Sequence, residues 1–410
     1  MIKYSFVIPT YNCRLLLKNL LHSLNAQTNY QPGSYEVVIV DDGSNDGTQQ
    51  CVLEMAERIK FNFKLNYIYL ERTAESCRAR TRNTGWRAAQ GEFVIFLDAD
   101  MIVKNDYLHQ LERYFLKNPN LVIVGTRLML DKPVSEEHVI SGKFFADYRF
   151  DRNAFTTCET RHFLFNKISY NAAAFKNTWL IVYTCNLAMA KKHLYTIDGF
   201  DENFKGWGLE DIELGYKSAQ KGLQIVINPY IEAFHQFHGA VFGAVPSVER
   251  FVNRKKNLDV FYKKHPEVKK KMSKLKYIRY IYRDIDKLLT KKTGTQEEYT
   301  IEFKELTEVE KVKETILQLS SRKNLHIIVR DYLEKADLDL WIQLLGPTGA
   351  VISYYPMSRV FDDHSLRSFI NSHYREKRRA VMVNLGAAFC QWLWKTFKDQ
   401  WNACGLKNNQ

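Results

Sequence analysis

The order of apolar and polar residues predicts alternating strands and helices over the first hundred residues. Apolar, β-branched runs of strand length occur at 4–8, 35–40, 65–70 and 92–97, and Pro9 is expected to stop the first. Helical patterns lie between these runs, at 15–24, 46–60 and 78–90. Unbroken apolar strands joined by helices are typical of a parallel sheet covered on both faces, so we predict an α/β fold.

Further along, the pattern loosens and then resumes. Aromatic residues crowd 130–180 (Phe144, Phe145, Tyr148, Phe150, Phe155, Phe163, Phe165 and Tyr170), which favours a lid or a substrate-binding excursion. A helix is predicted from about Leu209 and a strand over 223–227. From 297, β–α–β alternation returns with strands at 300–303, 325–329 and 350–355, helices at 308–320 and 336–345, and a final Trp-rich helix near 389–401. We therefore predict an α/β domain at 1–249, a basic helical segment at 250–296 and a small α/β accessory domain at 297–410.

The positive charge of the chain is concentrated in the basic segment. The net charge is +13, from 59 Lys and Arg against 46 Asp and Glu, and +11 of it lies between Arg254 and Lys292. Such a run is either a solvated helix or a surface attracted to membrane headgroups, an acidic polymer or phosphates. Interleaved Tyr277, Tyr280 and Tyr282 suit a membrane interface or base stacking, but no zinc-finger or RNA-binding signature accompanies them, so nucleic acid is not expected as a partner.

Composition narrows the class of protein. The chain has 410 residues, 45% of them hydrophobic and 26% charged, within the globular range. Its apolar runs are far shorter than the ~18–20 residues of a membrane span, and no secretory leader is expected from its first residues. The 7 cysteines include no CxxC pair, which favours reduced thiols. We predict a cytoplasmic protein, with a peripheral contact at the inner face of a membrane as an option.

Acidic residues follow two of the predicted strands, and polar residues follow a third. Asp98-Ala99-Asp100 comes after 92–97, Asp41-Asp42 after 35–40, and Pro9-Thr10-Tyr11-Asn12 after 4–8. In parallel sheets, ligands bind beyond the carboxyl ends of the strands. Two carboxylates at the end of a buried strand need a positive partner, and Mg²⁺ or Mn²⁺ bridging diphosphate oxygens would supply it; the alternative is a simple turn.

Two later segments add candidate chemistry. In Gly206-Trp207-Gly208-Leu209-Glu210-Asp211, the glycines allow an unusual backbone that projects the Trp ring, and both acids fall in the first turn of a helix, where the helix dipole favours their ionised form. An ionised carboxylate there can act as general base on a hydroxyl, although an N-terminal charge preference alone would explain the acids. His235 and His238, taken to follow the strand at 223–227, can complete a coordination sphere or be structural.

With these elements in order, residues 1–245 resemble family 2 glycosyltransferases of the GT-A fold. The matching residues are Val7-Ile8-Pro9-Thr10-Tyr11-Asn12, Val40-Asp41-Asp42-Gly43-Ser44, Arg82-Asn83, Phe96-Leu97-Asp98-Ala99-Asp100, Gly199-Phe200-Asp201-Glu202 and Gly206–Asp211. The last block is also similar to a C-terminal signature of β-1,4-galactosyltransferases, polypeptide N-acetylgalactosaminyltransferases and bacterial chondroitin-polymerase-like enzymes. Residues 250–410 match no family pattern.

The resemblance implies a role for each matching residue. Pro9, Thr10 and Tyr11 would pack against the nucleotide, Asp41 and Asp42 would read uracil or ribose, and Arg78 would reach uracil or diphosphate. Asp98 would contact ribose or sugar hydroxyls. Asp100 and His235 would bind Mn²⁺ or Mg²⁺, with His238 against the diphosphate. Asp211 would be the catalytic base, and Trp207 and Glu210 would hold donor or acceptor sugar.

These roles predict a metal-dependent inverting transferase. It would move a hexose or N-acetylhexosamine from a UDP-sugar to an acceptor hydroxyl on a glycan, glycolipid or protein. Two alternatives remain open from sequence: a nucleotide-sugar-fold binding protein without catalysis, and a basic membrane- or polyanion-binding protein. The sequence leaves the donor sugar, the acceptor and the oligomeric state undecided.

Overall fold

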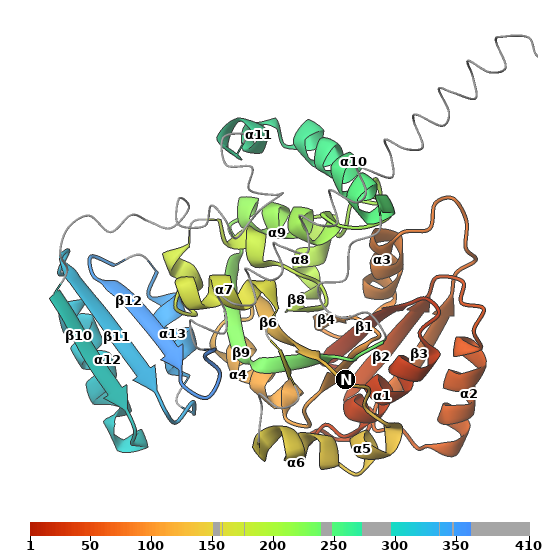
Figure 1. Ribbon diagram of the computed structural model, residues 1–410, viewed down its shortest axis with the longest axis horizontal. Coiled ribbons are helices and arrows are strands. Elements are labelled where there is room, and N and C mark those ends of the chain that lie inside the picture. The colour runs from red at the N-terminus through yellow and green to blue at the C-terminus, as the bar shows by residue number, and fades with distance from the viewer. Residues whose placement is uncertain are drawn as a thin grey trace, which may run out of the picture.

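The protein is built around one large sheet with a small sheet beside it (Figure 1). A computed structural model describes residues 1–150, 156–157, 159–175, 177–238, 248–272, 297–335, 337–346 and 348–361. The strands of the large sheet are β1 (Tyr4–Thr10), β2 (Tyr35–Asp41), β3 (Lys64–Tyr69), β4 (Phe93–Leu97), β5 (Met101–Val103), β6 (Leu121–Leu130), β7 (Thr156–Thr157), β8 (Asn186–Ala190) and β9 (Gln224–His235). The small sheet contains β10 (Glu297–Phe303), β11 (Leu325–Asp331) and β12 (Val351–Pro356).

The large sheet has the order β3-β2-β1-β4-β8-β6-β9-β5, with β7 paired to β6. The predicted parallel arrangement is confirmed for β3, β2, β1 and β4. The other half is mixed, because β8 runs antiparallel to both β4 and β6, and β5 runs antiparallel to β9. The predicted α/β class is therefore correct, but the sheet is only partly parallel.

Helices cover both faces of this sheet. They are α1 (Arg14–Asn25), α2 (Thr48–Arg58), α3 (Arg78–Ala88), α4 (Tyr107–Lys117), α5 (Glu136–Ile140), α6 (Lys143–Phe150), α7 (Thr160–Lys167), α8 (Lys191–Thr196) and α9 (Glu210–Gln220), with 3₁₀ turns η1 (Ala172–Ala174) and η2 (Thr178–Ile181). Alternate residues of β1 divide between two cores: Phe6 and Ile8 pack with α1 and α4, while Val7 packs with α3 and the α9 side. The period of two along a strand explains this division.

Two strands extend beyond their predicted ends. Pro9 does not stop β1, because β4 pairs with β1 only as far as Val7. Beyond that point β1 has a single neighbour, and a residue without an N–H can continue a strand with a free side. β9 does not end at Ile227 but runs on to His235, so His235 lies inside the strand. The Asn228-Pro229 pair, which looks like a turn, forms an irregularity within β9.

The aromatic residues predicted to form a lid are largely core residues. Phe144, Tyr148, Phe165 and Tyr170 are buried, and the last two belong to the same core as α3 and α9. The side chains of Phe150 and Phe155 lie outside the described residues. Segment 159–181 is therefore part of the body of the molecule, where its aromatics fill space beside the sheet.

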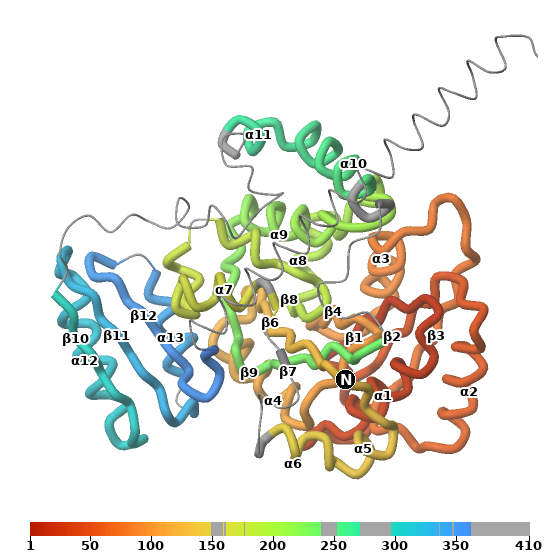
Figure 2. The backbone as a smooth tube through the Cα atoms, viewed as in Figure 1, coloured from red at the N-terminus to blue at the C-terminus, as the bar shows by residue number. Residues whose placement is uncertain are grey.

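The basic segment begins with two helices, α10 (Val248–Lys264) and α11 (Pro266–Met272), which pack over α9 (Figure 2). Phe261 of α10 is completely buried and stacks with Trp179 at 6.0 Å between ring centroids. α10 thus belongs to the core through one face. The three tyrosines at 277, 280 and 282 lie outside the described residues, as does the Trp-rich helix expected near 389–401. Among the residues that the structure describes, no helix has the length and apolar character to cross a bilayer.

The accessory sheet is parallel, in the order β10-β11-β12, as its β–α–β pattern predicts. Its connections contain the 3₁₀ turn η4 (Leu306–Glu308) and the helices α12 (Val309–Leu319) and α13 (Leu338–Leu344). α13 lies against β9 of the large sheet, where Gln343 is buried. The apolar residues of both sheets form one continuous core, so the accessory sheet is fused to the main body.

Candidate active site

The acidic turn after β4, Asp98-Ala99-Asp100, lies against the end of β9. The Asp100 backbone carbonyl accepts a hydrogen bond from the Gln236 N–H at 2.9 Å, and the Asp100 carboxylate lies 3.2 Å from Nε2 of His235. One ligand atom each from Asp100, His235 and His238 lie within 4.8 Å of one another. The structure therefore brings together the predicted ligands Asp100 and His235, and it adds His238, for which a diphosphate contact is predicted.

These three side chains fit a divalent cation. Oδ1 of Asp100 is buried and has no hydrogen-bond partner within the described residues, which leaves a carboxylate oxygen available for a ligand. Burial disfavours its charged form, but the hydrogen bond and charge of His235 keep the pKa of Asp100 below its ordinary value. One carboxylate and two imidazoles suit Mn²⁺ better than Mg²⁺, which prefers oxygen ligands only.

Arg82 connects the acidic turn to the second acidic motif. Its guanidinium is almost fully buried on α3 and donates to Asp98 at 3.0 Å and to Glu210 at 3.2 Å. Although burial opposes it, the charges of Asp98 and Glu210 raise the pKa of Arg82. Arg82 is among the residues that resemble the family pattern, but the sequence predicts no role for it. A buried Arg inside a helix has no local pattern that indicates its partners.

The predicted base Asp211 stands in the first turn of α9. Glu210 beside it is buried, and Oδ1 of Asp211 accepts the Ile212 N–H at 2.8 Å. Burial and the charge of Glu210, partly offset by Arg82, raise the pKa of Asp211 to about 7. From the sequence, the helix dipole is expected to favour the ionised form of Asp211, but the net shift of its pKa is upward. A pKa near the working pH suits a general base.

The loop that precedes Glu210 and Asp211 contains three residues with left-handed backbone conformations. Gly206, Gly208 and Leu209 have φ values of 69°, 94° and 81°. A Cβ on Gly206 would lie 2.4 Å from the Asn253 side chain, so this position also needs glycine for space. Asn257 of α10 donates to the carbonyls of Lys205 and Gly208, at 3.0 and 2.7 Å, which holds both ends of the turn.

Two predicted site residues lie at this loop: Trp207 within it and Arg78 beside it. Trp207 is half-buried, and the guanidinium of Arg254 on α10 lies 5.6 Å from its ring centroid. Arg254 also acts on the neighbouring base, because its charge opposes the rise in the pKa of Asp211. Arg78 is exposed and donates to the Gly206 carbonyl at 2.8 Å, so the structure places it against this loop.

The predicted nucleotide end forms at the tips of β1 and β2. Asp41 is buried, accepts the Ser44 N–H at 2.8 Å and accepts the hydroxyl of Tyr67. Asp42 pairs with Arg72 at 2.6 Å, and that guanidinium lies 3.9 Å from the centroid of the exposed Tyr11 ring. Tyr11, a predicted nucleotide contact, and Arg72, which the sequence did not single out, together form a flat cationic surface.

The remaining predicted nucleotide contacts are Pro9 and Thr10. Pro9 is half-buried and Thr10 is buried, and the Thr10 hydroxyl has no partner among the described residues. The pKa of the Cys13 thiol shows that this residue, which follows β1, lies near the acids that follow β2 and β4. Burial and the charges of Asp100, Asp46 and Asp98 raise the pKa of its thiol to about 12.

Two arginines, the buried Arg161 and the half-buried Arg127, lie near the acidic turn. Arg127 on β6 donates to Glu159 at 2.7 Å, and Arg161 donates to the other oxygen of the same carboxylate at 2.5 Å. Two arginines share one glutamate, which leaves an excess positive charge, and the charge of Arg127 helps to lower the pKa of Asp100. No feature of the sequence signals this triad, because its members come from two separate segments.

Two family models match the part of the chain that contains this site. Residues 5–179 match the family model described as glycosyl transferase family 2, and residues 167–239 match one described as the N-terminal domain of galactosyltransferase. These matches support a family 2 glycosyltransferase in this part of the chain, and the sheet flanked by helices is the GT-A fold.

Individual relatives are distant. Validoxylamine A glucosyltransferase of Streptomyces hygroscopicus subsp. limoneus is 30% identical over 273 residues, 64% of this chain and 57% of that protein. Chondroitin synthase of Pasteurella multocida is 29% identical over 249 residues, 57% of this chain and 24% of that protein. Among solved structures, S. aureus TarS 1-349 in complex with UDP-GlcNAc has a TM-score of 0.43 at 19% identity, covering 62% of this chain and 64% of that one. This chain thus spans less than two thirds of the length of each relative.

Proposed function

We propose that this protein is a metal-dependent, inverting glycosyltransferase that moves a hexose or N-acetylhexosamine from a UDP-sugar to an acceptor hydroxyl. The observation that carries the proposal is the Arg82 bridge, at 3.0 Å to Asp98 and 3.2 Å to Glu210. It joins the acidic turn that would hold the donor to the helix start that would hold the acceptor, so both lie in one site. The raised pKa of Asp211 also favours a catalytic role for this carboxylate over the alternatives without catalysis.

The chain's own groups support a single displacement. Asp211 takes the proton of the acceptor hydroxyl as that oxygen forms a bond to the anomeric carbon, and the bond from that carbon to the diphosphate breaks so that UDP leaves. The resemblance to the Gly-Trp-Gly-x-Glu-Asp signature favours this assignment. Trp207 offers an apolar face to a sugar ring, and Arg82 holds Glu210 and Asp98 in place.

At the other end of the donor, Tyr11, stacked with Arg72 at 3.9 Å, would support the base. Asp41 and Asp42 would accept hydrogen bonds from uracil or ribose. Asp100, His235 and His238 would hold Mn²⁺, which when bound offsets negative charge on the departing diphosphate. His238 lies close enough to serve as a ligand, and the same position allows contact with the diphosphate.

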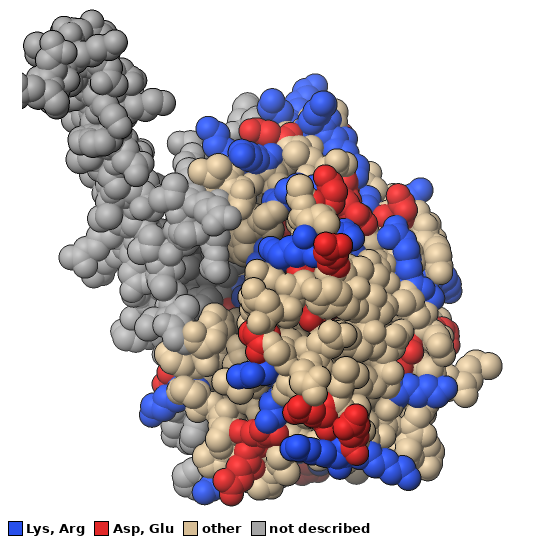
Figure 3. Space-filling view, turned by 90° about the vertical axis from the view of Figure 1, so that its right-hand side faces the viewer, with Lys and Arg blue, Asp and Glu red and all other residues tan. Residues whose placement is uncertain are grey.

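The basic helices support a second, peripheral contact. Lys255 and Lys256 on α10 and Lys269 on α11 are exposed, and Figure 3 shows Lys and Arg gathered at the top of the molecule, the height of these helices in Figure 1. An anionic membrane surface would attract such a patch. Binding to vesicles with and without anionic lipid, compared between the wild type and a variant with these three lysines changed to Gln, tests it; equal binding would contradict it.

The transferase proposal is tested with a panel of UDP-sugars, Mn²⁺ or Mg²⁺, and release of UDP as the readout, followed by an acceptor screen on the best donor. Asp211→Asn and Asp100→Ala are each expected to lower turnover at least ~100-fold. Asp198→Asn is the matched control, because this exposed carboxylate lies in a left-handed turn that Asn tolerates. Turnover by either site variant close to that of the control would refute the assignment.

A further inference from the structure

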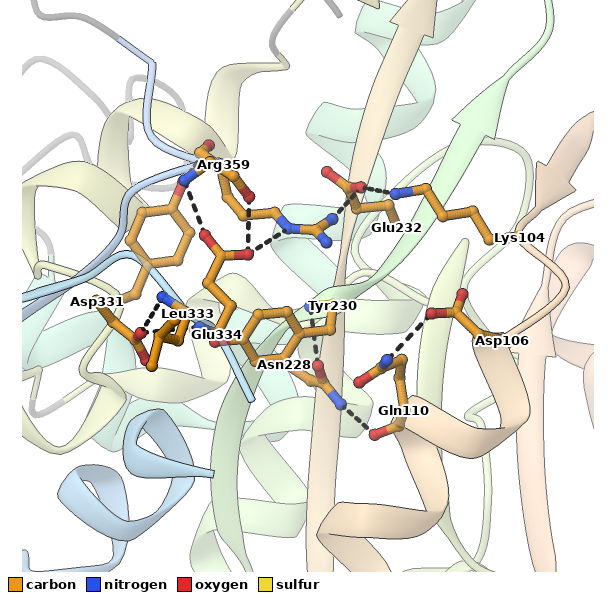
Figure 4. A network of polar contacts seen from close by, with 12 residues as sticks. Lys104, Asp106, Gln110, Asn228, Tyr230, Glu232, Asp331, Leu333, Glu334 and Arg359 are labelled. Atoms are coloured by element: carbon orange, nitrogen blue, oxygen red, sulfur yellow. Dashed lines mark hydrogen bonds and ion pairs between the residues drawn. The ribbon is translucent and has the colours of Figure 1, made fainter. Parts of the chain in front are cut away.

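The accessory sheet and its helix α13 contact several points of one strand of the large sheet, β9. The Gln343 side chain accepts the Ile227 N–H at 2.8 Å and donates to the Ile227 carbonyl at 2.9 Å, as a neighbouring strand would. The hydroxyls of Tyr230 and Tyr354 hydrogen-bond at 2.8 Å. Arg359, just after β12, forms an ion pair with Glu232 (Figure 4).

These contacts surround an irregularity in β9. In the pairing with β6, Gly125 faces Asn228 but Thr126 faces Glu232, so residues 229–231 are extra on β9. They are held locally: Asn228 accepts the Tyr230 N–H at 2.9 Å, and Asn186 donates to the Ile231 carbonyl at 2.7 Å. Because a bulge interrupts the ladder, the register before it does not fix the register after it. After the bulge the ladder with β6 resumes at Thr126–Glu232 and continues to Met129–His235, so Glu232 is the first residue of the new register and an anchor there helps to fix it.

That segment is one side of the short ladder beside the candidate metal site. β5 pairs with β9 through Met101–His235, Ile102–Phe234 and Val103–Ala233. At one end of this ladder lies the contact of Asp100 with His235 at 3.2 Å. At the other end, Lys104 pairs with Glu232 at 2.8 Å, and Arg359 binds the same carboxylate.

The partners of Glu232 include the two cations Lys104 and Arg359 and the hydroxyl of Tyr148, which lies 3.4 Å from its oxygens. Its side chain is 1% exposed, and a buried carboxylate is costly unless it is paired and hydrogen-bonded. Arg359 is also held from the accessory side: its Nε donates to Glu334 at 3.2 Å, and its guanidinium lies 5.4 Å from the Tyr230 ring centroid. Figure 4 shows Arg359 between Glu334 and Glu232, the two carboxylates that it joins.

We infer that Arg359 is a positioning residue for the candidate metal site. By fixing Glu232 at the point where β9 resumes after its bulge, it holds the register that presents His235 to Asp100. The accessory sheet, which lies outside the matched residues 5–239, thereby sets the cation affinity of the site in the large sheet. This inference rests on the proposed function, because it requires that Asp100 and His235 bind Mn²⁺.

The test measures Mn²⁺ binding directly, by the electron paramagnetic resonance signal of free Mn²⁺, with the full chain and no donor or acceptor present. Arg359→Ala is expected to raise the Mn²⁺ Kd about 10-fold, the lower end of effects seen for groups that orient metal ligands. Arg322→Ala is the matched control. Arg322 lies on the same sheet unit and pairs with the exposed Glu297 at 2.7 Å, so its removal changes the net charge equally and should leave the Kd unchanged.

The sign of the change separates positioning from simple electrostatics. Removing a positive charge near a cation site would by Coulomb's law alone tighten Mn²⁺ binding, whereas loss of register weakens it. In a Glu232→Gln background, Arg359→Ala should have no further effect. Should Arg359→Ala not fold, Arg359→Lys decides, because a point charge cannot reach both Glu232 and Glu334.

An unchanged or lower Kd in a folded Arg359 variant, beside a wild type that binds Mn²⁺, would overturn this inference and leave the proposed function standing. A wild type that does not bind Mn²⁺ would overturn both.

Discussion

The pH dependence of turnover should report the charge of Asp211, and Glu210→Gln should move it. Burial and the neighbouring charge of Glu210 raise the pKa of Asp211 to about 7. The amide variant removes that charge and keeps a side-chain oxygen for Arg82, which donates to Oε1 of Glu210 at 3.2 Å. The substitution therefore changes the electrostatics of the base while preserving the bridge.

The expected size follows from the titration. With a pKa of about 7, roughly one tenth of Asp211 is ionised at pH 6 and roughly nine tenths at pH 8, so turnover should rise about 10-fold between them. A like charge on an adjacent carboxyl raises a pKa by roughly one unit or more. Without it, about half of Asp211 should be ionised at pH 6, and the rise to pH 8 should shrink to about twofold.

The assay is UDP release at saturating donor and acceptor across pH 6 to 8, with Mn²⁺ saturation confirmed at each pH. Asp198→Asn, the exposed carboxylate used above, should follow the wild-type profile. Wild-type and Glu210→Gln profiles that coincide would refute the reasoning, whatever their absolute rates.

Three further predictions concern the supporting structure. Arg82→Ala should lower the free energy of unfolding, measured in urea, by about 3–5 kcal/mol, because Asp98 and Glu210 lose their shared cation. Arg87→Ala, at a half-exposed position of the same helix, should lower it by under about 1 kcal/mol. Similar losses for the two variants would contradict the bridge. Burial raises the pKa of Asp339 to about 7, so the folded protein keeps a proton that the unfolded chain releases near pH 4, and the free energy of unfolding should fall as pH rises towards 7. Asp339→Asn should flatten that fall. Parallel curves of unfolding free energy against pH for the wild type and the variant would count against this prediction. Phe261→Ala should cost about 3–5 kcal/mol if α10 belongs to the core, and a loss below about 1 kcal/mol would show that it does not.

The local part of the fold was predictable because its signals are local. The strands at β1, β2 and β4 have unbroken apolar runs, and the acids at their ends follow directly in the sequence. The meeting of Asp100 with His235 was predicted through the family resemblance. Two predicted strand ends, at Pro9 and at Ile227, were wrong. Whether a proline such as Pro9 can stay in a strand depends on the strand beside it.

The rest depends on contacts between distant segments. Arg82 lies 128 positions from Glu210, and nothing around it in the sequence announces that carboxylate. The upward shift in the pKa of Asp211 has the same origin: the helix start favours the charged form, but burial beneath other segments outweighs it. Aromatic residues of 159–181 look like those of a binding loop in composition, and only packing distinguishes the two.

The side-chain amide of Gln343 takes the place of a strand along β9, which bears on how this chain can be shortened. The family matches stop at residue 239, and a cut there would keep every predicted site residue. Such a fragment would leave the Ile227 backbone without the Gln343 amide, and it would leave Glu232 with Lys104 but without Arg359. Exchange of C-terminal parts between relatives should fail for the same reason, unless the replacement brings its own amide and guanidinium to that edge.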